Sequence, residues 1–225
     1  MRWLIDQWWR LVRFGFRLLY YELSFTYDIV SKVVSLGAWR CWQRTSLDFI
    51  PAPNAGTILE LAHGTGDLQI DLKERGYATI GFDLSPYMGR IAQRKLNRRD
   101  LQSKLVNGAG QSLPFASGVF PAVIVTFPTS FIFQPATLQE IQRVLQDDGV
   151  LIVVLSGLFD GSGPLRAVLE WLYRITGQRS PDFDGATANL ETEVVERVQP
   201  FGYEVRLEQV QCPRSLALVL IARKK

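Results

Sequence analysis

A short segment with two glycines, ILELAHGTGDL at residues 58–68, has the residue types of a loop that binds a ligand through its backbone. An acid, Glu60, ends an apolar run, and Gly64 and Gly66 follow before a helix-like stretch. Glycines in such a turn let a ligand touch the backbone where a side chain would collide. The dinucleotide fingerprint G-x-G-x-x-G is absent, because Gln69 stands three residues after Gly66. The segment therefore predicts a nucleotide-type site without the NAD spacing.

A second acid, Asp83, ends the next apolar run, in TIGFDLSPYM. A carboxylate at this place can accept hydrogen bonds from both ribose hydroxyls of a nucleoside. The alternative is structural, since Asp83 and Ser85 could cap the helix that follows. The glycine loop upstream favours the ribose role, and the two signals together predict binding of a nucleoside without a pyrophosphate.

From about residue 57 onward, short runs rich in Ile, Val and Leu alternate with helix-like stretches, which is typical of a mostly parallel sheet covered by helices. We expect strands near 57–62, 78–83, 103–107, 121–127, 149–156, 203–211 and 215–223. Helices are expected at 66–75, 86–99, 135–146, 164–176 and 189–199. Few residues separate the last two strands, so these should pair antiparallel. The sequence thus predicts a doubly wound α/β fold, with a mostly parallel seven-stranded sheet that ends in an antiparallel hairpin.

Four motifs then make a resemblance specific: E-x-A-x-G-T-G from Glu60, F-D-L-S-x-x-M from Phe82, LPFASGVFPAVIVTFPTSF at 113–131 and EIQRVLQDDGVLIVVL at 140–155. In order and spacing the series is similar to the core of class I S-adenosylmethionine (SAM) dependent methyltransferases, of the methyltransferase type 11 kind. The resemblance covers roughly residues 57–157. It implies a Rossmann-like fold, SAM as cofactor and methyl transfer as the activity.

The resemblance also implies which residues bind the cofactor. Glu60 would lie near the amino group of the SAM methionine, Asp83 would hold the ribose hydroxyls, and Thr126 would close the pocket beneath the methyl donor. The full set implied is Glu60, Ala62, His63, Gly64, Thr65, Gly66, Asp83, Leu84, Ala109, Gly110 and Thr126. In this set Gly64, Thr65 and Gly66 line the methionine end, and Ala109 and Gly110 sit beside adenine.

The sequence departs from the family pattern at four positions. Ala62 stands where the first glycine is usual, and Ala109 where many members have Asp or Asn. Pro121 replaces the Asp of an "F-D" pair, and Asp148 the first glycine of a Gly-Gly pair. None of these changes removes the ribose acid or the glycine loop.

Catalytic and metal-binding groups are not marked by the sequence. His63 is the only histidine, and without a Cys or His companion we expect no metal site; we expect it to pack against the cofactor. Spacing marks no residue as a catalytic base, so the base stays unknown. The basic residues Arg90, Arg94, Lys95, Arg98, Arg99 and Lys104 fall on and just after one expected helix, so we interpret them as a solvated face and expect no nucleic acid partner.

The first 50 residues differ from the rest in character and carry the net charge of +3. At helical spacing, Arg2, Asp6, Arg10, Arg13 and Arg17 form one narrow stripe, while Trp, Leu, Ile, Val and Phe cover the remainder. We expect residues 1–50 to be an N-terminal helical segment on a methyltransferase domain at 51–225. Its wide apolar face, mainly within residues 1–22, could be a lid, a peripheral membrane contact, a contact with a lipophilic substrate or a dimer contact.

Residues 27–42, YDIVSKVVSLGAWRCW, resemble the segment before the SAM core of the ubiquinone and menaquinone biosynthesis C-methyltransferases. That likeness implies a lipophilic ring as methyl acceptor, similar to a quinone precursor, with Tyr27 near the site of methyl transfer. A long excursion at 157–190, with an apolar and aromatic lining, is expected to cover the active site.

Cys41 and Cys212 form no Cys-x-x-Cys or Cys/His cluster, so both are expected to be reduced. Charges interrupt the first apolar stretch, which argues against a secretory signal and for a cytoplasmic protein, peripheral at most on the inner face of the membrane. Two other functions stay open: a non-catalytic protein of the SAM fold that binds a membrane or a partner, and a methyltransferase of soluble small molecules.

Overall fold

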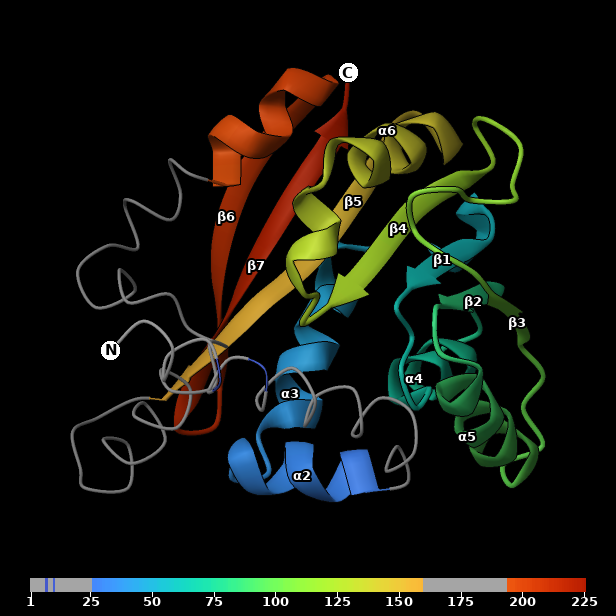
Figure 1. Ribbon diagram of the computed structural model, residues 1–225, viewed down its shortest axis with the longest axis vertical. Coiled ribbons are helices and arrows are strands. Elements are labelled where there is room, and N and C mark those ends of the chain that lie inside the picture. The colour runs from blue at the N-terminus through green and yellow to red at the C-terminus, as the bar shows by residue number, and fades with distance from the viewer. Residues whose placement is uncertain (1–6, 8–9, 11–25, 160–193) are drawn as a thin grey trace.

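The computed structural model describes Gln7, Arg10, residues 26–159 and residues 194–225. Its centre is a seven-stranded sheet with the order β3-β2-β1-β4-β5-β7-β6 (Figure 1). The strands are β1 (Ile58–Leu61), β2 (Thr79–Asp83), β3 (Lys104–Asn107), β4 (Phe120–Thr126), β5 (Leu145–Phe159), β6 (Tyr203–Cys212) and β7 (Ser215–Lys224). Neighbours from β3 to β5 pair in parallel, whereas β7 pairs antiparallel with both β5 and β6. The predicted fold class is confirmed.

Helices α4, α5 and α6 fall close to the predicted ranges, and α2 and α3 lie within the N-terminal segment that was expected to be helical. They are α2 (Tyr27–Val34), α3 (Trp39–Arg44), α4 (Asp67–Glu74), α5 (Pro86–Asn97) and α6 (Pro135–Val144), with 3-10 turns η2 (Thr45–Phe49), η3 (Pro53–Ala55), η4 (Ser130–Phe133) and η6 (Gln199–Phe201). Residues 194–198 are helical, in agreement with the end of the helix expected at 189–199. The helix expected at 164–176 lies outside the described residues. So do most residues of the amphipathic helix expected at the N-terminus. Of these, Gln7 and Arg10 are described, and both are helical and exposed.

The sheet buries both of its faces, and alternate residues of the central strands belong to two separate cores. Leu59, Val123 and Val153 point to one face, where Leu138, Ile141 and Val144 of α6 cover them. Ile58, Ile124 and Ile152 point to the other, which packs against α3, η2 and α4 through Trp42, Leu47, Leu68 and Leu72. A strand buried on both faces reads as a continuous apolar run, which is why these strands were predictable.

Pro121 lies inside β4, a central strand where a residue without an N–H group is unusual. The pairing of β4 with β5 shifts register between Phe120 and Ala122. Pro121 lies at this irregularity, so its missing N–H group interrupts no regular row of hydrogen bonds between the strands. Its ring lies 3.3 Å from the point that a Cβ on Gly56 would take. The proline therefore packs against the chain that leads into β1.

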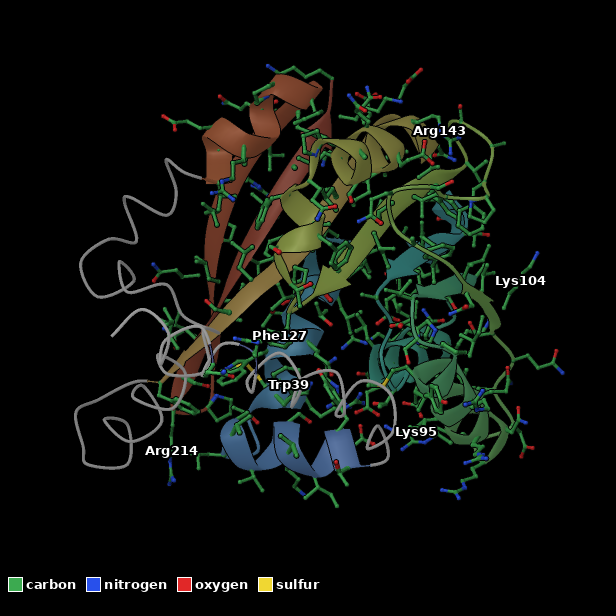
Figure 2. All side chains as sticks on the ribbon, in the orientation of Figure 1. Trp39, Lys95, Lys104, Phe127, Arg143 and Arg214 are labelled. Carbon is green, nitrogen blue, oxygen red and sulfur yellow. A yellow bond between two sulfur atoms is a disulfide. The ribbon has the colours of Figure 1, made fainter. Side chains whose placement is uncertain are left out.

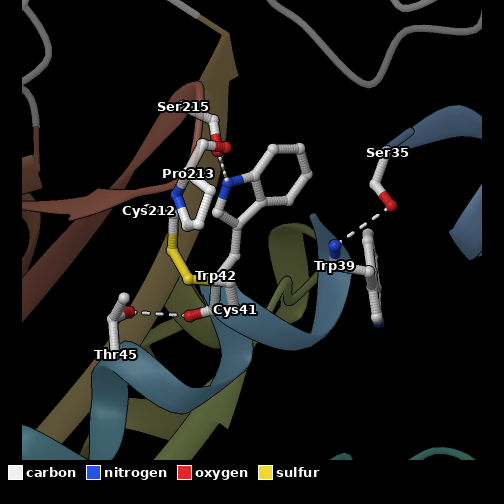
Figure 3. The surroundings of a disulfide bond; sticks show 8 residues. All are labelled: Ser35, Trp39, Cys41, Trp42, Thr45, Cys212, Pro213 and Ser215. Carbon is white, nitrogen blue, oxygen red and sulfur yellow. Dashed lines mark hydrogen bonds between the residues drawn. A yellow bond between two sulfur atoms is a disulfide. The ribbon is translucent and has the colours of Figure 1, made fainter. Parts of the chain in front are cut away.

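The expectation of two reduced cysteines is wrong: Cys41 of α3 and Cys212 of β6 form a disulfide (Figure 3). Beside it, the indole Nε1 of Trp42 donates to Ser215 Oγ at 3.0 Å. The two sulfurs meet because α3 packs against β5, where Cys41 and Trp42 reach the turn between β6 and β7. Cysteine spacing does not reveal this contact between distant parts of the sequence. Disulfides are rare in the reducing cytosol, so the cysteines lend no support to the cytoplasmic location that was expected from the charges in the first apolar stretch.

In the described part of the chain, no helix is long and apolar enough to cross a bilayer. The described residues also contain no group of three or more His, Cys, Asp or Glu side chains that could hold a metal ion.

Candidate functional site

In the loop after β1, every second residue from Ala62 to Gly66 has a left-handed backbone conformation, with a positive φ. Ala62, Gly64 and Gly66 have φ angles of 60°, 54° and 82°, and α4 begins directly afterwards at Asp67. A positive φ costs alanine roughly 1–2 kcal/mol relative to glycine. Because the backbone at position 62 is left-handed, glycine is the residue that adopts it most easily. This explains why the family pattern usually has a glycine where this chain has Ala62.

The two glycines of this loop have different surroundings. A Cβ on Gly66 would lie 2.6 Å from the Cβ of Ala92 and 3.0 Å from its Cα, so this glycine lets α5 approach the loop. A Cβ on Gly64 would meet nothing within 4 Å. Open space next to a left-handed glycine is what a ligand needs to approach the backbone, so Gly64, and not Gly66, has the surroundings of a cofactor contact.

Asp83 lies at the carboxyl end of β2 and joins that strand to the loop. Its Oδ2 accepts from Gly64 N at 2.8 Å, and its Oδ1 accepts from Ser85 N at 2.7 Å. Ser85 in turn caps α5, with its Oγ accepting from Met88 N. The structural and the ligand roles of Asp83 are compatible, because an ionised carboxylate has about four acceptor positions and these bonds occupy two.

Glu60 is buried with 1% of its surface exposed, and Gln69 Nε2 of α4 donates to its Oε2 at 2.7 Å. Burial raises the pKa of Glu60 from 4.5 to about 8, a change that the hydrogen bond from Gln69 partly opposes. A carboxyl group in this setting is neutral over much of the physiological pH range unless a cation comes close.

The ring of His63 packs against β2, where a Cβ on Gly81 would come within 2.9 Å of the imidazole. Its Nδ1 lies 2.8 Å from the carbonyl oxygen of Gly64, so this nitrogen carries a proton and donates. Burial lowers the pKa of His63, although the nearby charge of Asp83 opposes the change. The geometry makes His63 a neutral packing residue beneath the loop.

A cavity of about 30 Å³ lies where this loop meets the end of β4 and the N-terminal helices. Its lining is Tyr27, Trp39, Gln43, Ala62, His63, Gly64, Thr65, Asp67 and Thr126. It therefore brings together six of the residues singled out from the sequence. Glu60, Gly66, Asp83, Leu84, Ala109 and Gly110 lie outside the lining. Of these, Leu84 is 62% exposed, Ala109 is exposed, and Gly110 is buried next to Phe131.

Trp39 and Gln43, which sequence reasoning did not select, come from α3 and lie one helical turn apart. Trp39 stacks on Phe127, with ring centroids 4.0 Å apart (Figure 2). Tyr27 meets Trp39 edge-on at 6.3 Å. Phe127 follows Thr126 at the end of β4 and has a φ of 50°, a strained value for a bulky residue. The i, i+4 spacing of Trp39 and Gln43 was the signal that could have identified them.

Polar contacts tie α2 to the loop. Thr65 Oγ1 donates to Asp28 Oδ1 at 2.6 Å, and Lys95 Nζ donates to Thr65 Oγ1 at 3.0 Å. Lys95 also forms ion pairs with Asp28 and, at 3.0 Å, with Asp67. The residue after Tyr27 thereby fixes the start of α2 against the loop, which keeps the tyrosine at the cavity.

The model of the ubiE/COQ5 methyltransferase family matches residues 16–161. The chain belongs to this family. A demethylmenaquinone methyltransferase from Thermus thermophilus is 34% identical over 170 residues, 74% of this chain and 75% of that protein. A ubiquinone/menaquinone biosynthesis C-methyltransferase from Syntrophotalea carbinolica is 31% identical, covering 70% and 66% of the two chains. This family member is thus a SAM-dependent methyltransferase, as the sequence motifs implied.

Solved structures agree on the fold. A SAM-dependent methyltransferase from Thermotoga maritima superposes with a TM-score of 0.62 at 19% identity, covering 89% of this chain and 96% of the other. Two features of the site suit the binding of SAM. There is open space beside Gly64, and the carboxylate of Asp83 lies next to that space.

Proposed function

We propose that the protein transfers the methyl group of SAM to a ring carbon of a prenylated quinol of the demethylmenaquinol type. The observation that carries this proposal is the aromatic cluster of Tyr27, Trp39 and Phe127 beside the glycine loop. Flat, apolar side chains suit a bicyclic ring and would serve a soluble amine or acid poorly. The names of the relatives point to the same class of acceptor.

Within this proposal each residue of the site has a role. Gly64 and Thr65 would line the methionine part of SAM with Glu60 behind them, and Asp83 with Leu84 would hold the ribose. Ala109 and Gly110 would flank adenine, Thr126 would lie beneath the methyl group, and Tyr27 would contact the acceptor. Ala62, His63 and Gly66 shape the loop.

Bound SAM supplies the electrophilic methyl group, and the protein's own contribution is alignment and exclusion of water. The stacked rings of Trp39 and Phe127 form an apolar wall at the end of β4, next to the loop. Because this apolar wall excludes water, water cannot compete with the ring carbon for the methyl group of SAM.

The cavity of about 30 Å³ has room for about one water molecule, and not for an acceptor ring. Acceptor entry therefore requires α2 to separate from the loop, because the disulfide of Cys41 holds α3 in place. We propose that α2 opens and closes over the loop as part of the N-terminal segment, while α3 stays docked on the domain of residues 51–225. The bonds from Lys95 and Thr65 to Asp28 are the contacts that such opening would break.

The proposal is tested by incubating the purified protein with methyl-labelled SAM and a prenylated 1,4-naphthoquinol. We expect label in the quinol, at a ring carbon by mass spectrometry and NMR. Asp83→Asn keeps the shape of the side chain but loses its charge, and should weaken SAM binding about tenfold. Asp48→Asn, at an exposed position, is the matched control. Label only in soluble acids or amines would contradict the proposed acceptor, and unchanged SAM affinity in Asp83→Asn would remove the ribose role.

Membrane contact is a finer part of the proposal. Ile29, Val33 and Leu36 on and just after α2 are 66%, 64% and 53% exposed, which adds apolar surface next to the N-terminal segment. We propose that residues 1–22 attach the protein peripherally to an anionic membrane surface. The full chain should co-sediment with anionic vesicles, more at low than at high salt, and a form that begins at residue 23 should not. If both forms stay in the supernatant, the proposed membrane contact is contradicted.

A further inference from the structure

Gln43 of α3 is a buried polar side chain that the fold leaves partly unsatisfied. It is 8% exposed, and its Nε2 donates to Thr126 Oγ1 at 3.4 Å, a long bond. Its Oε1 is buried without a hydrogen-bond partner. A buried carbonyl oxygen without a donor is costly and rare, and such a group calls for a functional explanation.

The amide of Gln43 lies at the cavity next to the cofactor loop. Gln43 and Thr126, the two ends of the long hydrogen bond, both line the cavity, and so do Gly64 and Thr65 of the loop. Trp39, one turn earlier on α3, lines it too and stacks on Phe127. The side chain that carries the unpaired oxygen therefore lines the cavity together with the indole of Trp39.

Contacts on both sides of α3 fix the position of Gln43. The disulfide of Cys41 and the bond from Trp42 to Ser215 fasten the helix to the β6–β7 hairpin (Figure 3). Toward α4, the guanidinium groups of Arg40 and Arg44 lie 2.8 Å and 2.9 Å from Asp71 Oδ1. Trp42 also lies so close to β5 that a Cβ on Gly157 would be 2.2 Å from the indole. A helix held in this way presents Gln43 in one position, as orientation of a substrate requires.

We propose that Gln43 Oε1 accepts a hydrogen bond from a ring hydroxyl of the methyl acceptor and thereby selects which ring carbon faces SAM. The inference rests on the proposed function, because it assigns a contact to the acceptor of that reaction. The ligand chemistry it requires is a phenol or hydroquinone, since the oxygen needs an O–H donor and the surrounding rings need an aromatic partner. An acceptor in the oxidised quinone form has no such donor and should be oriented poorly.

The test uses Gln43→Met, which keeps the length and volume of the side chain but removes the acceptor oxygen. We expect its KM for a prenylated naphthoquinol to rise about tenfold, the effect of one lost hydrogen bond, with an unchanged Kd for SAM by calorimetry. Gln43→Glu retains an acceptor oxygen and should recover most of the affinity for the quinol. Gln93→Met, at an exposed position of α5, is the matched control and should behave as the native protein. Thermal unfolding of each variant establishes that it is folded.

A binding measurement separates this inference from the proposed function. The probe is 1-naphthol, compared with 1-methoxynaphthalene, titrated into protein saturated with S-adenosylhomocysteine. Native protein should prefer the naphthol about tenfold, and Gln43→Met should bind both alike. If this holds while no quinol is methylated, the proposed function fails and the contact stands. Equal naphthol affinity in the native protein and in Gln43→Met overturns the inference, and so does a loss of SAM binding alone.

Discussion

Gly66→Ala should lower the free energy of unfolding by about 3 kcal/mol or more, which for a domain of this size leaves little margin. Two effects add up. The φ of 82° is unfavourable for any residue with a Cβ, and the new methyl group would lie 2.6 Å from the Cβ of Ala92. Urea unfolding followed by circular dichroism measures the loss. Stability within 1 kcal/mol of the native protein would contradict the close approach of α5 to the loop.

Gly64→Ala is the matched control for this prediction. Its φ of 54° carries a conformational cost of roughly 1–2 kcal/mol, but its Cβ meets nothing within 4 Å. We therefore expect a folded protein that binds SAM at least about tenfold more weakly, because the methyl group occupies space that the cofactor needs. If Gly64→Ala binds SAM normally, the cofactor does not approach the loop at this residue.

The sequence predicted the centre of the sheet well because strands β1 and β4 are short and buried on both faces. The pattern around Ile58, Ile124 and Ile152 has no polar alternation, and this distinguishes a parallel central strand from a surface one. The hairpin of β6 and β7 followed from the short link at Pro213. Strand β5 is longer than expected, at Leu145–Phe159, since it continues along β7 past the end of β4.

The contacts of α3 could not be predicted, because they join positions far apart in the sequence. The pairing of Cys41 with Cys212 and of Gln43 with Thr126 depends on how the N-terminal helices lie on the finished sheet. Local patterns carry no information on such docking. The cavity is therefore only partly predictable. Its loop residues belong to a motif, whereas the i, i+4 spacing of Trp39 and Gln43 shows that they share a helix face but not that this face lies against the loop.

Departures from the family pattern become interpretable once the backbone is known. Ala62 and Asp148 both replace glycines and both have positive φ, at 60° and 61°. Asp tolerates this conformation better than most residues, so Asp148 is the milder change. Pro121 occupies a register shift beside Gly56. Two of these three residues lie outside the cavity lining, so those changes adjust the scaffold, while Ala62 shapes the loop itself.

Glu60 should make the stability of the protein depend on pH. Burial raises its pKa to about 8 in the folded state, against 4.5 for an exposed glutamate. Between these values the folded state keeps a proton that the unfolded state has released, so the free energy of unfolding falls as pH rises, by up to about 1.4 kcal/mol per pH unit. Below pH 4.5 the group contributes no pH dependence, and above pH 8 the loss is complete.

Glu60→Gln removes this ionisation and keeps an oxygen that can accept from Gln69. The variant should match the native protein near pH 4.5 and exceed its stability by a few kcal/mol, about 5 at most, above pH 8. Urea unfolding from pH 5 to 9 measures the difference, and Glu74→Gln, at a 47% exposed side chain, should leave the native slope unchanged. Saturating SAM should flatten the native slope, since its positive charge near Glu60 favours the carboxylate and lowers the pKa. If the plots of stability against pH are parallel for Glu60→Gln and the native protein, Glu60 is ionised in the folded state and the prediction is wrong. If SAM leaves the native slope unchanged, the amino group of the cofactor lies away from Glu60.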